Sequence, residues 1–85
     1  MAHIVFTSHL QSFVPCAAQD VSGETVGAAL ARIFETNERL RAYVLDDQGR
    51  LRKHVFVFVD GRRARLEDAI GPSTEIHVLQ ALTGG

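Results

Sequence analysis

The residues with the clearest chemical potential end this 85-residue chain, which finishes Leu82-Thr83-Gly84-Gly85. Glycine has no Cβ atom, so a diglycine segment can pass through a narrow channel and adopt backbone angles closed to other residues. Four extended residues reach about 13 Å. The group that reacts would be the α-carboxylate of Gly85, with Gly84, Thr83 and Leu82 giving access to it.

A free carboxylate is a poor electrophile and needs activation before a nucleophile attacks it. Reaction with ATP would give an acyl adenylate, and attack by a sulfur nucleophile would then give a thiocarboxylate that can donate sulfur. No side chain of this protein is required. The ordinary interpretation of terminal glycines is a frayed end. Their position just after the last predicted strand favours the functional interpretation.

Other reactive residue types give no site. The single cysteine, Cys16, has no histidine–acid pattern beside it and is interpreted as a structural thiol. The four histidines share no metal-ligand spacing, so no metal site is expected; they are His3, His9, His54 and His77. Paired carboxylates, a phosphate loop and a catalytic triad are absent from the sequence. We therefore predict no catalytic residue, no bound cofactor and no enzymatic activity.

Composition narrows the functional classes further. Nine basic and ten acidic residues give a net charge of −1, which disfavours nucleic-acid binding. The longest apolar run, Val55 to Val59, is far too short to span a bilayer. The start of the chain lacks the pattern of a signal peptide, and one cysteine allows no internal disulfide. These features predict a cytoplasmic protein without membrane partners.

Arginines gather in one part of the chain, at Arg50, Arg52, Arg62, Arg63 and Arg65. The ordinary interpretation is a solvated hairpin face. The alternative is a basic patch that meets an acidic surface of a partner.

Alternation of apolar and polar residues predicts five strands. They span His3–Thr7, Cys16–Val21, Lys53–Val59, Arg62–Arg65 and Thr74–Ala81. One helix is predicted over Val26–Thr36, with Thr25 as its N-cap. The segments between them are assigned to a turn or wide hairpin loop at Ser8–Pro15, a short irregular turn at Asn37–Arg41, a tight hairpin at Asp60-Gly61 and a single helical turn at Leu66–Ile70.

This β-β-α-β-β-β order predicts an α+β fold: a mixed sheet of four to five strands with one main helix on one face. Residues 1–81 would form one domain and residues 82–85 a flexible tail. The core is predicted from the two periodicities. Its members are Ile4, Phe6, Val26, Leu30, Ile33, Phe34, Val55, Val57, Val59, Ile76 and Val78.

A second set of apolar residues would lie on the opposite face of the sheet. Phe56 and Phe58 alternate with the core valines, and His77 and Leu79 do so in the last strand. Left uncovered, these four residues would form a docking surface for a partner. Alternatively, the early strands or the loop after the first strand cover them.

The chain resembles a known family in three places: the helix start Glu24-Thr25-Val26, the strand and turn Val57 to Gly61, and the ending Ile76 to Gly85. It is similar to the ubiquitin-like sulfur-carrier proteins of the MoaD/ThiS family, which have the β-grasp fold. The family includes the molybdopterin-synthase small subunit, the thiamin sulfur carrier and the thiocarboxylate carrier of cysteine biosynthesis. The last is closest in appearance, although Gln80 stands where proline is usual.

The resemblance implies that Gly85 is adenylated and thiocarboxylated and that Gly84 is needed for access. It also implies three partners. A ubiquitin-activating-type adenylyltransferase would bind and use ATP. A rhodanese or desulfurase protein, or free sulfide, would supply sulfur. An acceptor synthase would consume it.

Two alternatives stay open at this point. In the first, the chain is a ubiquitin-like protein modifier that is joined through Gly85 to a lysine amine of its target. In the second, it is a non-covalent interaction domain whose glycines are incidental. The sequence names no end product among cysteine, thiamin, molybdopterin and thio-containing metabolites.

Overall fold

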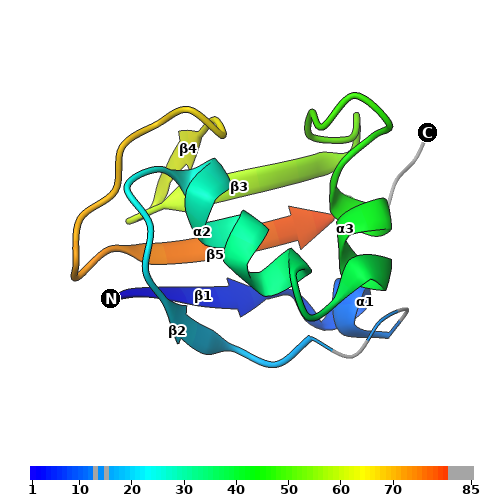
Figure 1. The fold of residues 1–85 in the computed structure, drawn as a ribbon, viewed down its shortest axis with the longest axis horizontal. Helices are drawn as coiled ribbons and strands as arrows, with labels where there is room; N and C mark the ends of the chain where they lie inside the picture. Colours follow the sequence, from blue (N-terminus) through cyan, green and yellow to red (C-terminus); the bar gives the residue numbers. More distant parts are fainter. Residues whose placement is uncertain (13, 15, 81–85) are drawn as a thin grey trace.

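A five-stranded mixed sheet runs through the molecule, as the computed structural model of residues 1–12, 14 and 16–80 describes it (Figure 1). The strand order is β2-β1-β5-β3-β4. The central pair β1 and β5 is parallel, and the other pairs are antiparallel. The strands are β1 (Ala2–Phe6), β2 (Gln19–Val21), β3 (Val55–Val59), β4 (Arg62–Ala64) and β5 (Glu75–Gln80). This is the β-grasp topology, so the predicted α+β fold class is confirmed.

Among the described residues, three helices accompany the sheet: α1 (Ser8–Gln11), α2 (Val26–Phe34) and α3 (Glu38–Val44). In Figure 1, α2 and α3 lie in front of one face of the sheet, and α1 lies at the end where β1 stops. We call the face under α2 and α3 the covered face and the opposite one the open face. The predicted main helix is α2, and it ends at Phe34 rather than at Thr36.

The start of α2 is held by two kinds of acceptor. The side-chain hydroxyl of Thr25 accepts a hydrogen bond from the amide of Ala28 at 3.1 Å, as predicted for the N-cap. The amides of Val26 and Gly27 donate to the backbone carbonyls of residues 68 and 66, at 3.0 and 2.8 Å. A Cβ on Gly27 would lie 3.2 Å from the second carbonyl oxygen, so glycine allows this close approach.

The segment that supplies these carbonyls is not helical. The prediction of a helical turn over Leu66–Ile70 is wrong, because the segment forms turns and a bridge between Ala69 and Thr25. Its backbone carbonyls are directed to the first turn of α2 instead of to a turn of its own. A tertiary contact has thus replaced a local one.

The prediction of an irregular turn over Asn37–Arg41 is also wrong, because α3 begins at Glu38. The side-chain oxygen of Asn37 caps the helix by accepting from the amide of Leu40 at 3.3 Å. Leu40 and Val44 are four residues apart and both are fully buried. A short amphipathic helix therefore packs beside α2.

The predicted loop Ser8–Pro15 contains a further helix, α1. Leu10 and Val14, again four residues apart, are buried in the core. The side-chain amide of Gln11 donates to the carbonyl of Phe6 at 2.7 Å. Leu10 and Val14 of this segment therefore contribute to the core.

The core lies between the covered face and the helices. Every predicted core residue is buried except Val59, which is half-buried. On the sheet, the covered face presents Ile4, Phe6, Val55, Val57, Ile76 and Val78. The open face presents Val5, Phe56, Phe58, His77 and Leu79, all half-buried.

The hairpin predicted at Asp60-Gly61 is confirmed. Both residues have positive φ, 49° and 86°, as a two-residue turn with both central residues left-handed requires. The Asp60 carboxylate accepts from the Glu75 amide at 3.0 Å, and the Asp60 amide donates to the Glu75 carbonyl at 2.9 Å. The turn is thus tied to the start of β5.

Candidate functional site

The chain leaves the sheet at the end of β5. Gln80, the last residue of β5, pairs with Val55, the first residue of β3. The predicted reactive residue Gly85 and its neighbours Leu82, Thr83 and Gly84 lie outside the described residues. The surfaces beside Gln80 are therefore the part of the candidate site whose geometry can be stated.

Three of the four predicted docking residues share one hollow on the open face. Phe58, His77 and Leu79 line an almost wholly apolar depression of about 320 Å³. The cross-strand register places Phe58 opposite His77 on neighbouring strands. The hollow also includes Val5, Thr7 and Gly61, which the sequence analysis did not select.

Phe56, the fourth predicted docking residue, lies next to the hollow. It pairs with Leu79 across β3 and β5. The guanidinium carbon of Arg63 lies 4.5 Å from the centre of its ring, which is a cation–π contact. The four predicted residues therefore form one continuous half-buried apolar strip, bordered by a cation on the β4 side.

Signals for all three missed residues are present in the sequence. Val5 alternates with the buried Ile4 and Phe6, so its side chain must face the other side of β1. Gly61 lines the hollow because the tight hairpin predicted at Asp60-Gly61 places it beside the end of β3. The same alternation places Thr7 on this side, and the amide of Thr7 donates to the carbonyl of Val78 at 3.1 Å.

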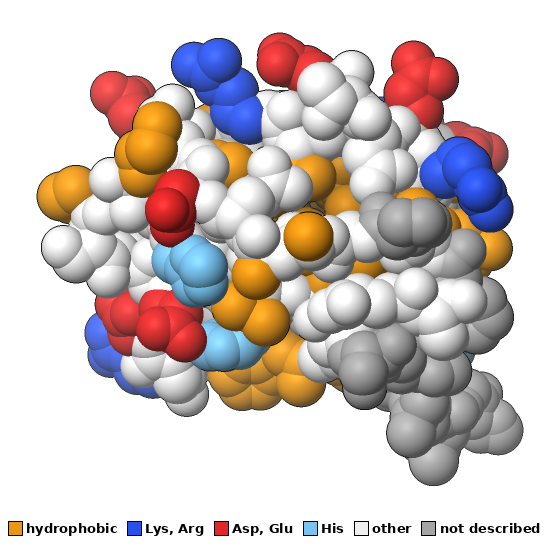
Figure 2. Space-filling view, turned by 90° about the horizontal axis from the view of Figure 1, so that it is seen from below, with side chains coloured by type: hydrophobic (Ala, Val, Ile, Leu, Met, Phe, Trp, Pro, Cys, Tyr) orange, Lys and Arg blue, Asp and Glu red, His pale blue; other side chains and the backbone are white. Residues whose placement is uncertain are grey.

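Two histidine–carboxylate pairs lie at the strip or beside it, one between β1 and β2 and the other within β5. His3 Nδ1 lies 2.9 Å from Asp20 Oδ1, and His77 Nε2 lies 3.3 Å from Glu75 Oε1. Figure 2 shows histidine side chains beside acidic ones, with hydrophobic side chains adjacent to them. Within the described residues, no group of three or more His, Cys, Asp or Glu side chains is arranged to hold a metal ion.

Cys16 is buried with 6% of its surface exposed. Burial raises the pKa of its thiol, because the thiolate is disfavoured away from water. A reactive cysteine needs the opposite environment. The geometry supports the structural interpretation of this residue.

Two buried side-chain oxygens lie near the base of the tail without hydrogen-bond partners among the described residues. They are Thr7 Oγ1 and Gln80 Oε1. Leaving such an atom unpaired costs about 1–3 kcal/mol. This end of the sheet therefore retains hydrogen-bonding capacity that the described part of the chain does not use.

The described part of the chain contains no helix that is long and apolar enough to cross a membrane.

No family model and no curated protein matches this chain, whereas solved structures match it over almost its full length. SAMP1 from Haloferax volcanii is 26% identical, with a TM-score of 0.82 and coverage of 99% of this chain and 98% of that one. A chain of the Amycolatopsis orientalis BexX/CysO complex is 16% identical, with a TM-score of 0.84 and complete coverage of both chains. Mycobacterium tuberculosis CysO is 18% identical, with a TM-score of 0.81 over 96% of this chain and 100% of its own.

These matches show that the chain has the fold of the ubiquitin-like small proteins, as the resemblance implied. Their coverage is nearly complete in both directions. At this level of identity the two CysO comparisons establish the fold, and the role of the chain must be argued from its own residues.

Proposed function

We propose that this chain, which shares its fold from end to end with SAMP1 and CysO, is a sulfur carrier that works through the carboxylate of Gly85. The observation that carries the proposal is the position of the diglycine. It ends the chain five residues beyond Gln80, the last residue of β5 in a β-grasp domain. In this proposal residues 82–85 form an arm that reaches into another protein while the domain stays outside.

The chemistry takes place in two balanced steps. A carboxylate oxygen of Gly85 attacks the α-phosphorus of ATP, and pyrophosphate leaves. Hydrosulfide then attacks the carbonyl carbon of the acyl adenylate, AMP leaves, and a proton is released as the thiocarboxylate forms. If a protein persulfide delivers the sulfur, a thiol reductant must then cleave the acyl disulfide that forms.

The family resemblance implies three partners for this chemistry. A ubiquitin-activating-type adenylyltransferase binds ATP and performs the first step. A rhodanese or desulfurase protein, or sulfide itself, supplies the sulfur. An acceptor synthase removes it. The solved complex of CysO with BexX is an instance of a similar chain bound to a second protein.

The apolar strip on the open face supports docking to such partners. Folding leaves four side chains of this strip partly exposed: Phe56, Phe58, His77 and Leu79. Three of them line the hollow. An apolar depression with an aromatic wall is the kind of surface that contributes most to binding. The domain would thereby present its tail in a fixed direction.

A second candidate function is protein modification. SAMP1, the 26% identical structural match, is named a small archaeal modifier protein. In this mechanism the acyl group of Gly85 is transferred from the adenylate, directly or through a thioester, to a lysine amine of a target. The tail chemistry is shared up to the adenylate, so only the product distinguishes the two functions.

The test is the intact mass of the chain after incubation with an activating enzyme, ATP and sulfide. A carrier gains the difference between one sulfur and one oxygen atom, located at Gly85. A modifier instead gives lysine-linked adducts in cell extract. The matched variants are the chain lacking Gly85, which should not react, and Gly71→Ala, which should react normally because an added Cβ there makes an ordinary 3.7 Å contact.

The third hypothesis is a non-covalent interaction domain with incidental glycines. It predicts no mass change and no adduct, together with full function in cells of the chain that lacks Gly85. That combination of results would contradict both the carrier and the modifier.

A further inference from the structure

Positive charge is concentrated in one segment of this nearly neutral chain. Residues 50–65 contain six basic residues and one acidic residue, a net charge of +5. The other 69 residues contain three basic and nine acidic residues, a net charge of −6. We call the six cations the basic edge: Arg50, Arg52, Lys53, Arg62, Arg63 and Arg65.

The fold places these cations along one border of the sheet. β4 is the outermost strand and carries Arg62 and Arg63. The turn before β3 carries Arg52 and Lys53. Four of the cations, Arg52, Lys53, Arg63 and Arg65, line one open hollow of about 250 Å³ together with apolar residues of β3.

The basic edge is poorly neutralised within the chain. Arg50 and Arg65 make long ion pairs with Asp46 and Glu67, at 4.0 and 3.9 Å, and all four side chains are substantially exposed. Such pairs contribute little. In the part of the chain that the structure describes, no salt bridge involves the other cations of the edge.

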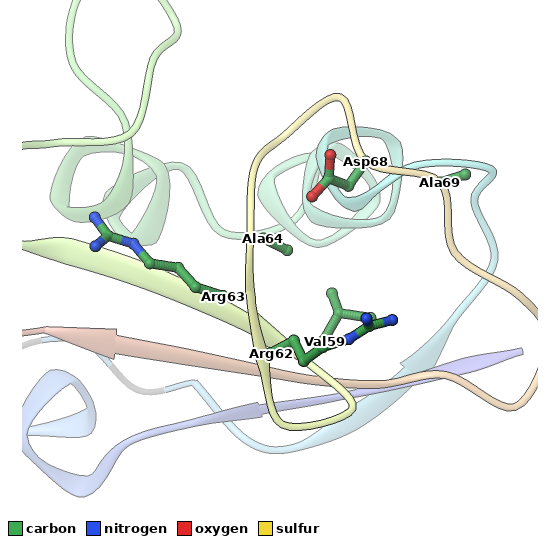
Figure 3. A pocket seen from close by; sticks show the side chains of 6 residues that line it. All are labelled: Val59, Arg62, Arg63, Ala64, Asp68 and Ala69. Atoms are coloured by element: carbon green, nitrogen blue, oxygen red, sulfur yellow. The ribbon is translucent and has the colours of Figure 1, made fainter.

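Figure 3 shows how two of these cations, Arg62 and Arg63, are placed on β4. Arg62 and Arg63 leave the strand in different directions, and neither points at the nearby Asp68. The Asp68 carboxylate instead accepts a hydrogen bond from the amide of Arg65 at 3.0 Å. The neighbouring acid thus holds the backbone, and the two guanidinium groups stay available.

Arg63 is also pre-ordered. Its guanidinium stacks on the ring of Phe56, which fixes a side chain that otherwise loses considerable entropy on binding. This contact joins the basic edge to the apolar strip of the open face. A partner that covers Phe56 would therefore meet Arg63 at once.

Charge on an edge strand also opposes edge-to-edge pairing of sheets. That role accounts for Arg62 and Arg63 on β4, but not for Arg52 and Lys53, which precede β3. It does not account for the hollow that gathers cations from both segments either.

We infer that the basic edge binds an acidic surface of a protein partner, along β4 and the turn before β3. A protein is favoured over nucleic acid because the chain as a whole is slightly acidic, with a sequence pI of about 6.4. The turn before β3 lies beside the end of β5, since Val55 pairs with Gln80. A protein that takes up the tail can therefore reach the basic edge as well.

The test is an NMR titration of the full chain with a peptide of about twelve residues in which glutamate alternates with glycine. The chemical-shift changes should concentrate in residues 50–65. The affinity for the peptide should fall about tenfold between roughly 50 and 300 mM salt. Arg62→Glu with Arg63→Glu should weaken binding at least about tenfold. The matched pair Arg32→Glu with Arg39→Glu changes the same charge at exposed helical positions and should leave binding within about twofold.

Equal losses in both pairs of variants, or shifts spread over the chain, would overturn the inference. So would tighter binding of an oligothymidine of similar length and charge, which would point to nucleic acid. Shifts in residues 50–65 on raising the concentration of the chain alone would point to a second copy. The titration involves no reaction at Gly85, so a chain that binds the peptide but is never loaded with sulfur refutes the carrier and leaves the basic edge standing.

Discussion

The two faces of the sheet are built from the same strands but differ in how far folding covers them. Along β5, Ile76 and Val78 on the covered face are 0% exposed, whereas His77 and Leu79 on the open face are half-buried. Along β3, Val55 and Val57 show the same contrast with the two phenylalanines. The difference arises because α2 and α3 both pack on one side.

This contrast separates stability from recognition. Burial of a large apolar side chain stabilises the fold by roughly 1.5–3 kcal/mol, and the covered face gains this in full. The open face gains only part of it, although its side chains are as large. Apolar surface that folding leaves partly exposed is available to a partner.

The largest expected effect is a difference in stability between variants at two positions on β5. Ile76→Ala should lower the free energy of unfolding by about 2–5 kcal/mol, because it opens a cavity in the packed core. Leu79→Ala should lower it by less than about 1.5 kcal/mol, because its site is already partly open to water. Urea denaturation of both variants measures the difference. Equal losses would mean that the open face is also part of the core.

The covered and open faces were both predictable because alternation along a strand depends only on backbone geometry. Phe58 and Leu79 were assigned correctly to the side opposite Val57 and Val78 for this reason. The mixed sheet with its main helix on one face also followed, since the resemblance to the β-grasp proteins supplied the arrangement that alternation leaves open.

The failures share a different cause. α3 rests on two apolar residues four apart, α1 contains only one buried apolar residue, Leu10, and both helices were too short to stand out among polar neighbours. The segment Leu66–Ile70 failed because its backbone is paired with the first turn of α2, a contact between distant parts of the chain. The hollow itself was missed because it joins residues of different strands, and alternation within one strand does not specify which strands pair.

The next largest effect is expected on the loading of Gly85, if the open face is the docking surface for the proposed activating enzyme. Phe58→Ala and Leu79→Ala should each lower kcat/KM for loading of Gly85 by about tenfold or more, since a buried anchor at an interface contributes about 2 kcal/mol. Leu45→Ala is the matched control, because Leu45 is apolar and half-buried but lies on the helix side. If that variant loses as much, general destabilisation is responsible.

A smaller effect is expected at the hairpin that brings β3 to β4. Gly61 has a φ of 86°, and a Cβ added there would contact nothing within 4 Å. Gly61→Ala should therefore cost about 1–2 kcal/mol from backbone strain alone. Thermal unfolding would measure this against Gly71→Ala, where the added Cβ makes an ordinary 3.7 Å contact. A loss at Gly71 as large as that at Gly61 would refute the strain argument.

The smallest effect concerns pH and lies outside both faces, at Asp46 in the turn after α3. Hydrogen bonds from the Arg50 amide (3.0 Å) and the Gln48 amide (2.9 Å), with the charges of Arg50 and Arg52, hold the pKa of Asp46 below its usual value despite some desolvation. A carboxyl group with a lowered folded-state pKa stabilises the fold above its unfolded pKa of about 3.9 and loses that contribution as pH falls through the folded value. Asp46→Asn should therefore be less stable than the original chain near neutrality, and the gap should narrow below about pH 4. Urea denaturation from neutrality down to acid would show it. A gap that stays constant with pH would mean that the side chain acts through hydrogen-bond geometry and not through its charge.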